Sequence, residues 1–160
     1  MGYSLNSHAE NPYFIDFSKV LNLSKPGAEA QKKLKNKFQS ETTKFKKIED
    51  NIKKEESELI NQKKVLSPED YQKKLKALRK KVSDHQKNKK NSFSSIAKSR
   101  REAKQKLLIS VNPIIQKYME ENNIKVVLDK KSIVLGDKNL EITDKIISLL
   151  NKELPSLKIN

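Results

Sequence analysis

Hydrophobic residues recur at every seventh position along a stretch of the chain that contains neither glycine nor proline. The stretch runs from Ala28 to Leu66. Its repeating residues are Phe38, Phe45, Ile52, Leu59 and Leu66. The companion positions are half polar, namely Leu34, Glu41, Ile48, Glu55 and Gln62. Such a repeat lines one side of a helix, so the pattern predicts a long helix that has a narrow contact face and ends at Leu66.

A second long helix is predicted to begin directly after this stretch. Ser67 is a typical N-cap, Pro68 suits the first helical position, and acidic residues follow in the first turn. One face of this helix is hydrophobic, with Tyr71, Leu75, Leu78 and Val82. Because the connecting turn is tight, the two helices are expected to be antiparallel.

Folding the chain back at Ser67 predicts which residues meet across the two helices. The predicted pairs are Leu66 with Tyr71, Leu59 with Leu78, Phe45 with Phe93, and Leu34 with Ala103. Between Ser83 and Ser92 the hydrophobic face weakens, and we expect loose packing and flexibility there. His85 lies in this interval and is expected to be a partly exposed structural residue rather than a base or a ligand.

Short hydrophobic clusters lie towards both ends of the chain and predict a small sheet. The predicted strands are Pro12–Phe17, Lys125–Asp129 and Ser132–Leu135, the last two forming a hairpin around Lys130–Lys131. Further elements are a helical turn over Ser18–Leu23, a helix start at Ser24 and Pro26, a kink at Pro113 and a helix stop at Asn122–Asn123. Thr143 is predicted to cap a final helix, which buries Ile146, Ile147, Leu150 and Leu154.

The predicted fold class is α+β, with a small β-body built from both chain termini, a long antiparallel helical hairpin and a short C-terminal helix. Residues 1–11 are set aside as a disordered or vector-derived N-terminus. The β-body takes 12–27 and 107–160, and the hairpin takes 28–106 with its tip at 67–70. Three short strands with apolar side chains on both faces bury too little surface to be stable alone, so we expect self-association through the sheet. The residues expected at this interface are Phe14, Ile15, Phe17, Val126, Val127, Leu128, Ile133, Val134 and Leu135.

Charge divides the chain in the same way. The 160 residues include 35 Lys+Arg and 20 Asp+Glu, a net charge of +15. Residues 31–106 hold 25 of the basic and 10 of the acidic residues, so the whole excess lies in the predicted hairpin. A diffuse field of lysines suits acidic, poorly ordered partners or an anionic membrane surface. Specific recognition of nucleic acid is not expected, because only three of the basic residues are arginines and no aromatic residues alternate with them.

The residues that most enzymes need are scarce. The chain has no cysteine and three glycines, which excludes disulfides and gives no glycine-rich phosphate loop. Its two histidines, His8 and His85, are far apart, and no histidine and carboxylate residues have metal-ligand spacing. No apolar run approaches the roughly 20 residues that cross a bilayer. We therefore expect no enzyme activity, no metal and no cofactor.

Several blocks of residues near the ends of the chain occur in a characteristic order. Towards the C-terminus they are Val111–Ile115, Val127–Lys130, Ile133–Leu135, Glu141–Asp144 and Ile146–Asn151. Near the N-terminus the block is Phe14–Leu21. These blocks resemble the Skp/OmpH family of periplasmic chaperones over about Pro12 to Leu154, whereas the helical arms match by pattern only.

The resemblance implies a homotrimer with a β-barrel-like core, from which three helical hairpins extend as tentacles around a cavity. Such proteins hold unfolded outer-membrane β-barrel proteins without ATP and keep them from aggregating. A periplasmic location follows, with a signal peptide removed before this sequence begins. The basic arm residues expected to meet clients are Lys73, Lys74, Lys76, Arg79, Lys80, Lys81, Lys87, Lys89 and Lys90. Apolar arm residues expected to touch clients briefly are Ile48, Ile60, Val65 and Phe93.

The resemblance also implies a possible contact with lipopolysaccharide or anionic lipid. The basic residues in the corresponding helix are Lys98, Arg100, Arg101 and Lys104. Two other functions compete with the holding chaperone: an oligomeric coiled-coil adaptor or spacer, and a coiled coil that binds nucleic acid without sequence preference. Suppression of client aggregation separates the chaperone from the spacer.

Overall fold

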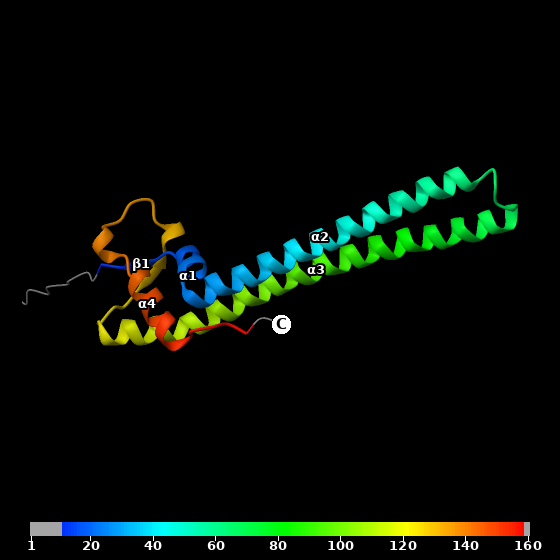
Figure 1. The fold of residues 1–160 in the computed structure, drawn as a ribbon. Coiled ribbons are helices and arrows are strands. Elements are labelled where there is room, and N and C mark those ends of the chain that lie inside the picture. The colour runs from blue at the N-terminus through cyan, green and yellow to red at the C-terminus, as the bar shows by residue number, and fades with distance from the viewer. Residues whose placement is uncertain (1–10, 159–160) are drawn as a thin grey trace, which may run out of the picture. The chain divides into compact units, whose positions relative to one another are not determined.

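The computed structural model describes residues 11–158, so the predicted N-terminal segment 1–11 lies almost entirely outside the described residues. The chain is mostly helical (Figure 1). In order, its elements are β1 (Tyr13–Ile15), α1 (Phe17–Leu23), α2 (Lys25–Gln62), α3 (Pro68–Glu121), β2 (Val127–Asp129) and α4 (Thr143–Glu153), with two short 3₁₀ helices over Lys130–Ser132 and Lys138–Leu140. The described residues form two compact units: an arm unit of residues 33–100, and a terminal unit that joins 11–32 with 101–158.

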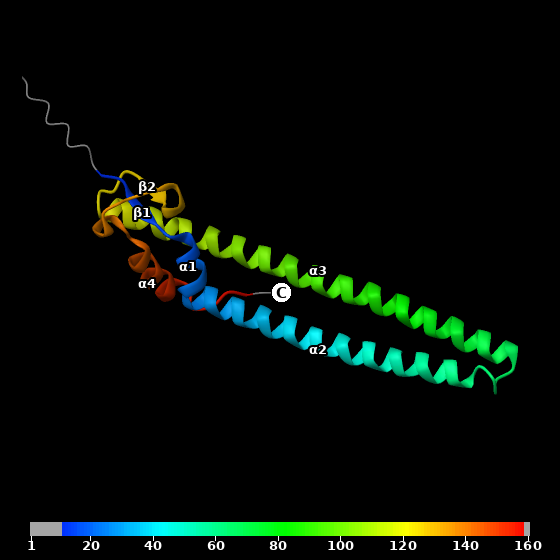
Figure 2. The same cartoon turned by 90° about the horizontal axis from the view of Figure 1, so that it is seen from above.

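The arm unit is an antiparallel pair formed by most of α2 and the first part of α3. Figures 1 and 2 both show the two helices side by side along this unit. The predicted contact line is confirmed at Phe45, Ile52 and Leu59, which are buried, and Leu59 packs against Leu78 as expected. Two details of the prediction are wrong: α2 ends at Gln62 rather than Leu66, and Phe38 remains 47% exposed.

The turn between the helices has the predicted cap. The Ser67 hydroxyl accepts a hydrogen bond from the Asp70 backbone N–H at 3.1 Å and donates one to the Asp70 carboxylate at 2.8 Å. Pro68 is the first residue of α3, where its missing N–H costs nothing. The cap fixes where the chain reverses, and therefore which residues of the two helices meet.

Removing the cap should loosen the hairpin end. Ser67→Ala leaves one N–H of the first turn of α3 without its side-chain acceptor, and we expect a loss of about 1 kcal/mol in unfolding free energy. Urea unfolding followed by circular dichroism measures it. Ser57→Ala, at an exposed position inside α2, is the matched control and should change stability by less than about 0.5 kcal/mol. Equal losses in both variants would contradict the role given to the cap.

The middle of the arm unit is not loosely packed, contrary to the sequence prediction. His85 is 8% exposed rather than partly exposed, and its ring meets Phe45 edge-on at 5.6 Å between centroids. The Ser92 hydroxyl donates a hydrogen bond to the Glu41 carboxylate at 2.7 Å. Polar pairs thus replace hydrophobic ones along this part of the contact line between α2 and α3, which we call the arm seam. A pattern of hydrophobic residues does not detect such polar pairs.

The terminal unit has a small core beneath a two-stranded parallel sheet. β1 pairs with β2 in the register Tyr13 with Val127, Phe14 with Leu128 and Ile15 with Asp129. Helix α1 contacts α4. The core residues with no measurable exposure are Ile15, Val20, Val111, Ile146 and Leu150. Residues from both ends of the chain therefore share one core, as the sequence pattern indicates.

The predicted strand pair Lys125–Asp129 and Ser132–Leu135 is not a hairpin. A two-residue hairpin turn at Lys130–Lys131 would need residues with positive φ. Across the described residues, positive φ is found for Asn123 alone, at 54°. β2 pairs with β1 instead, and directly after β2 the chain enters a 3₁₀ helix over Lys130–Ser132. Asn123 does end α3 in a left-handed conformation, as predicted.

The start of α4 also differs from the prediction. The N-cap is Ile142, and it makes no side-chain cap bond. The Thr143 hydroxyl instead accepts a hydrogen bond from the Asp16 backbone N–H at 2.9 Å and donates one to Glu141 at 2.9 Å. Thr143 therefore ties the segment after β1 to the C-terminal part of the chain, a contact between residues that are 127 apart in sequence.

The junction between α1 and α2 follows the predicted start signal. The Ser24 hydroxyl accepts a hydrogen bond from the Gly27 N–H at 3.3 Å, and α2 begins at Lys25. A side chain at Gly27 would bring its Cβ to 2.1 Å from the Leu21 carbonyl oxygen. Glycine is required here because the backbone of α1 passes directly over it.

Candidate functional site

The arm unit concentrates the positive charge of the chain. It holds 21 lysines and arginines against nine acidic residues, a net charge of +12. Eight of the nine basic residues predicted to bind clients are exposed, and Lys89 is half-buried. The structure brings three of them to acidic or polar partners across the seam: Lys74 to Gln62, Lys81 to Glu55 and Lys89 to Glu49. The described residues provide no such partner for Lys73, Lys76, Arg79, Lys80, Lys87 and Lys90.

Glu49 has two partners across the arm seam. Its Oε1 accepts hydrogen bonds from the Lys89 ammonium at 2.5 Å and from His85 Nε2 at 3.2 Å. The bond from Lys89, followed by that from His85, lowers the pKa of the Glu49 carboxyl below its ordinary value. The other ring nitrogen of His85 is buried and has no hydrogen-bond partner within the described part of the chain. This cluster joins the two helices across the seam.

A row of aromatic rings crosses the arm unit beside this cluster. The Phe93 ring lies 5.2 Å from that of Phe38 and 5.8 Å from that of Phe45, between centroids. Phe45 is buried, but Phe38 is 47% exposed and Phe93 is half-buried. The row therefore ends in an apolar surface on a strongly basic unit. The heptad pattern missed this surface, because it placed Phe38 within the seam.

Two other apolar residues of the arm unit are exposed as the sequence predicts. Ile60 is 69% exposed and Val65 is 84% exposed, both near the turn that joins α2 to α3. Ile48 is half-buried and packs against the cluster formed by Ile52, Leu59 and Leu78. The arm unit thus has exposed apolar side chains at separate places among its many exposed lysines.

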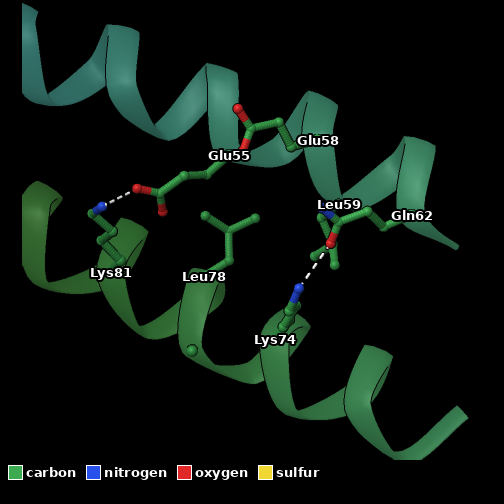
Figure 3. Close-up of a pocket in the computed structure, with 8 residues that line it drawn as sticks. Glu55, Glu58, Leu59, Gln62, Lys74, Leu78 and Lys81 are labelled. Atoms are coloured by element: carbon green, nitrogen blue, oxygen red, sulfur yellow. Dashed lines mark hydrogen bonds and ion pairs between the residues drawn. The ribbon is translucent and has the colours of Figure 1, made fainter. Parts of the chain in front are cut away.

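A shallow groove of about 280 Å³ opens between the helices near Ala77 (Figure 3). Leu59 and Leu78 point into it, while the Glu55–Lys81 pair and the Lys74–Gln62 hydrogen bond lie on either side. The groove can take an apolar side chain between polar walls. Across residues 11–158, no group of three or more His, Asp or Glu residues could hold a metal ion.

The residues predicted for lipid binding do not form one described site. Lys98, Arg100, Arg101 and Lys104 are all exposed. Lys98 and Arg100 belong to the arm unit, whereas Arg101 and Lys104 belong to the terminal unit. Within the described part of the chain, no helix is both long enough and apolar enough to span a membrane.

The residues predicted for self-association fall into three groups. Phe14 and Ile15 are buried within the chain itself, at 5% and 0% exposure. Phe17, Val127 and Ile133 are half-buried. The exposed group is Val126, Leu128, Val134 and Leu135. The exposed group offers most of the apolar surface that a single chain leaves open.

An ionic network in the terminal unit surrounds Glu141. Its carboxylate accepts hydrogen bonds from the Lys130 ammonium at 2.8 Å and from the Thr143 hydroxyl at 2.9 Å. The Lys130 bond is the main cause that lowers the pKa of Glu141, and the same bond raises the pKa of Lys130. Lys130 also lies 5.9 Å from the centre of the Phe14 ring.

Because of this network, the stability of the folded chain should decrease as the pH falls into the acidic range. A carboxyl whose pKa is lowered by folding stabilises the folded chain at neutral pH, and the contribution is lost as pH falls through the acidic range where the carboxyl takes up a proton. Glu141→Gln should cost no more than about 1 kcal/mol at pH 7, since both ionic groups are partly exposed. Its urea midpoint should fall less than that of the original chain between pH 7 and about pH 3.5. An identical acid dependence in both proteins would contradict this role.

These features define a class of protein: a chain with a basic helical hairpin in its middle and a second unit that is built from both chain ends. The sequence profile of the family described as "Outer membrane protein (OmpH-like)" matches residues 13–150. The chain therefore belongs to the OmpH-like family of outer membrane proteins.

A solved structure supports the same fold. A candidate OmpH-like outer membrane chaperone from Caulobacter crescentus matches with a TM-score of 0.86 and 16% sequence identity. The match covers 94% of this chain and 90% of that one. No curated protein matches the sequence significantly.

Proposed function

We propose that this protein is an ATP-independent periplasmic holding chaperone that binds unfolded outer-membrane proteins between the basic arms of a homotrimer and keeps them from aggregating. The observation that carries the proposal is the arm unit itself, whose net charge of +12 surrounds separate exposed apolar points. Membership of the OmpH-like family supports it.

Capture begins with electrostatic attraction. Unfolded barrel proteins are often acidic, and a diffuse field of lysines attracts such chains without demanding a fixed geometry. Lysines that lack a partner across the seam, such as Lys73 and Lys80, contribute most because no ion pair is found for them among the described residues. Attraction of this kind weakens as salt is added.

Retention follows from many weak apolar contacts. Phe38, Ile60 and Val65 are exposed at separate places on the arm unit, so an unfolded chain can touch several of them at once. Three arms held in one assembly raise the local concentration of these contacts. Release needs no nucleotide, because each contact is weak and the client leaves when it reaches a more stable folded state.

Self-association through the terminal unit completes the proposal. Leu128 in β2, Val126 directly before it, and Val134 and Leu135 after it are apolar residues that a single chain leaves exposed. A homotrimer would cover them and set three arms around one cavity. Lipopolysaccharide or anionic lipid is a further proposed partner of the basic residues Lys98, Arg100, Arg101 and Lys104.

An aggregation assay tests the proposal. A barrel protein diluted out of urea should stay dispersed when the full chain is present in threefold molar excess, and should scatter light without it. Native mass spectrometry should give three chains alone and three chains plus one client in the mixture. An oligomer that leaves aggregation unchanged would favour the competing spacer function, for which the ion pairs across the arm seam are the supporting observation.

A further inference from the structure

The row of three phenylalanine rings in the arm unit is covered at one end and open at the other. At the covered end Phe45 is 3% exposed, the His85 ring meets it edge-on, and the Lys44 ammonium lies 5.7 Å from its centroid. Phe93 lies in the middle of the row and contacts both of the other rings. At the open end Phe38 is 47% exposed. A further apolar group therefore has room to pack against Phe38.

The exposure of Phe38 is unusual for its position on the helix. Phe38 lies on the same line of α2 as Phe45 and Leu59, which are buried, and Leu34, one turn before it, is buried as well. At this level the contact with α3 is made by Phe93, whose ring lies beside that of Phe38. A large aromatic side chain thus stays half in solvent, and covering it with a partner would remove apolar surface from water.

The geometry of the row favours an aromatic ring as that partner over an aliphatic side chain. Rings attract each other in tilted or offset arrangements at about 4.5–7 Å between centroids, and the contact is stronger than the buried area alone accounts for. The two existing pairs have this arrangement, at 5.2 Å with a tilt of 46° and at 5.8 Å with a tilt of 55°. A fourth ring placed against Phe38 would continue the row.

Positive charge lies next to the open end of the row. Lys35 precedes Phe38 by three residues and Lys90 precedes Phe93 by three, so each lysine lies one helical turn from a ring and on the same side of its helix. Both lysines are exposed, and no ion pair is found for either among the described residues. A carboxylate close to the incoming ring would be attracted by both.

The acidic residue nearest in sequence to Phe38 is already engaged within the arm unit. Glu41, one turn after Phe38, accepts a hydrogen bond from the Ser92 hydroxyl at 2.7 Å and lies 3.7 Å from the Lys44 ammonium. Its negative charge is therefore partly offset, and it repels an incoming carboxylate less than a free side chain would. The surface around Phe38 thus suits a ring that has acidic neighbours.

We infer that the exposed ring of Phe38, with Phe93 behind it, is a docking point for an aromatic side chain that has carboxylates close to it in an unfolded protein. The inference rests on the proposed function and specifies which side chains of a client the arm unit binds. Outer-membrane barrels suit it, because they have girdles of aromatic residues at both membrane interfaces, and these residues are accessible while the barrel is unfolded.

Two disordered peptides test the preference for an aromatic ring. Each is a glycine- and serine-rich chain of about 24 residues that contains three repeats, either Asp-Tyr-Asp or Asp-Leu-Asp. Fluorescence anisotropy measures their dissociation constants with the full-length chain. We expect the tyrosine peptide to bind about two- to tenfold more tightly than the leucine peptide.

Variants of the chain assign this preference to Phe38. Phe38→Leu keeps an apolar side chain but removes the ring, so both peptides should then bind equally. Phe38→Tyr keeps the ring and should keep the preference. Ile60→Ala, which truncates an exposed apolar residue elsewhere on the arm unit, is the control and should also leave the preference unchanged. Circular dichroism verifies that each variant retains the helical content of the original chain.

A third peptide tests the role of charge. It has the composition of the tyrosine peptide, but every aspartate stands at least four residues from the nearest tyrosine. We expect it to bind about twofold more weakly than the original tyrosine peptide, as for an exposed ion pair. Replacing Lys35 and Lys90 together with glutamine should remove this difference. Replacing Lys73 and Lys76 with glutamine lowers the arm charge equally and should preserve it.

The results separate this inference from the proposed function. Equal binding of the tyrosine and leucine peptides by the original chain, no binding of either, or a preference that persists in Phe38→Leu would overturn the inference. A chain that prevents aggregation of a barrel protein without preferring the tyrosine peptide would contradict the inference alone. A chain that has the preference and loses it in Phe38→Leu, yet fails to prevent aggregation, would support the inference and contradict the proposed function.

Discussion

Truncation of Ile146 to alanine is expected to destabilise the full chain by about 2–5 kcal/mol. Ile146 has no measurable exposure and lies on the buried face of α4 together with Leu150. The terminal unit has few such residues, so a cavity at this position is a large fraction of the 5–15 kcal/mol that holds a typical domain together. Urea unfolding at fixed protein concentration, followed by circular dichroism, measures the loss.

Leu23→Ala is the control for this prediction. Leu23 is the last residue of α1 and is 63% exposed, so its truncation removes little buried surface. We expect a change below about 0.5 kcal/mol. Comparable losses for both variants would mean that α4 does not pack on the core as described.

Neutralising part of the arm charge is expected to slow client capture about tenfold at low ionic strength. The variant replaces four exposed lysines with glutamine: Lys73, Lys76, Lys80 and Lys87. Electrostatic steering accelerates association by about 10–10³-fold, and the arm unit would keep two thirds of its net charge. Stopped-flow fluorescence with a labelled, urea-unfolded barrel protein at about 10 mM salt measures the association rate.

The matched control removes the same number of lysines from the terminal unit. The exposed residues Lys25, Lys117, Lys145 and Lys152 are replaced with glutamine, which gives the same net charge for the whole chain. Capture should then slow by less than about threefold. At about 0.15 M salt the Debye length is about 8 Å, so the original chain and both variants should differ little. Equal slowing by the two sets, or a difference that persists at high salt, would contradict steering by the arms.

Local rules explain why much of the arm unit follows from sequence. The seven-residue spacing places Phe45, Ile52 and Leu59 on one face wherever the helix lies, because that spacing is close to two helical turns. The cap at Ser67 acts within a single turn. Where polar residues replaced hydrophobic ones, as at His85, the pattern gave the wrong degree of burial, because hydrophobicity carries no record of hydrogen bonds between side chains.

The candidate site was likewise predicted from the sequence only in its local features. The sequence located the lysines of the arm and the exposed Ile60 and Val65, since charge and turn position are local properties. It did not show which lysines are paired across the seam, and it missed the exposed ring of Phe38. The pairing of the lysines and the exposure of Phe38 depend on how far each residue lies from the line of contact between the two helices. The side chains of both helices together set that distance.

The sequence by itself determined that this chain forms a basic helical hairpin between two apolar ends and resembles the OmpH-like family. Spacing, capping and charge act over a few residues and need no knowledge of the rest of the fold. Only the tertiary structure decided that β2 pairs in parallel with β1, and that Ser132–Leu135 leaves the sheet. Strand pairing joins residues more than a hundred positions apart, and its outcome depends on backbone angles in a turn that hydrophobic pattern does not encode.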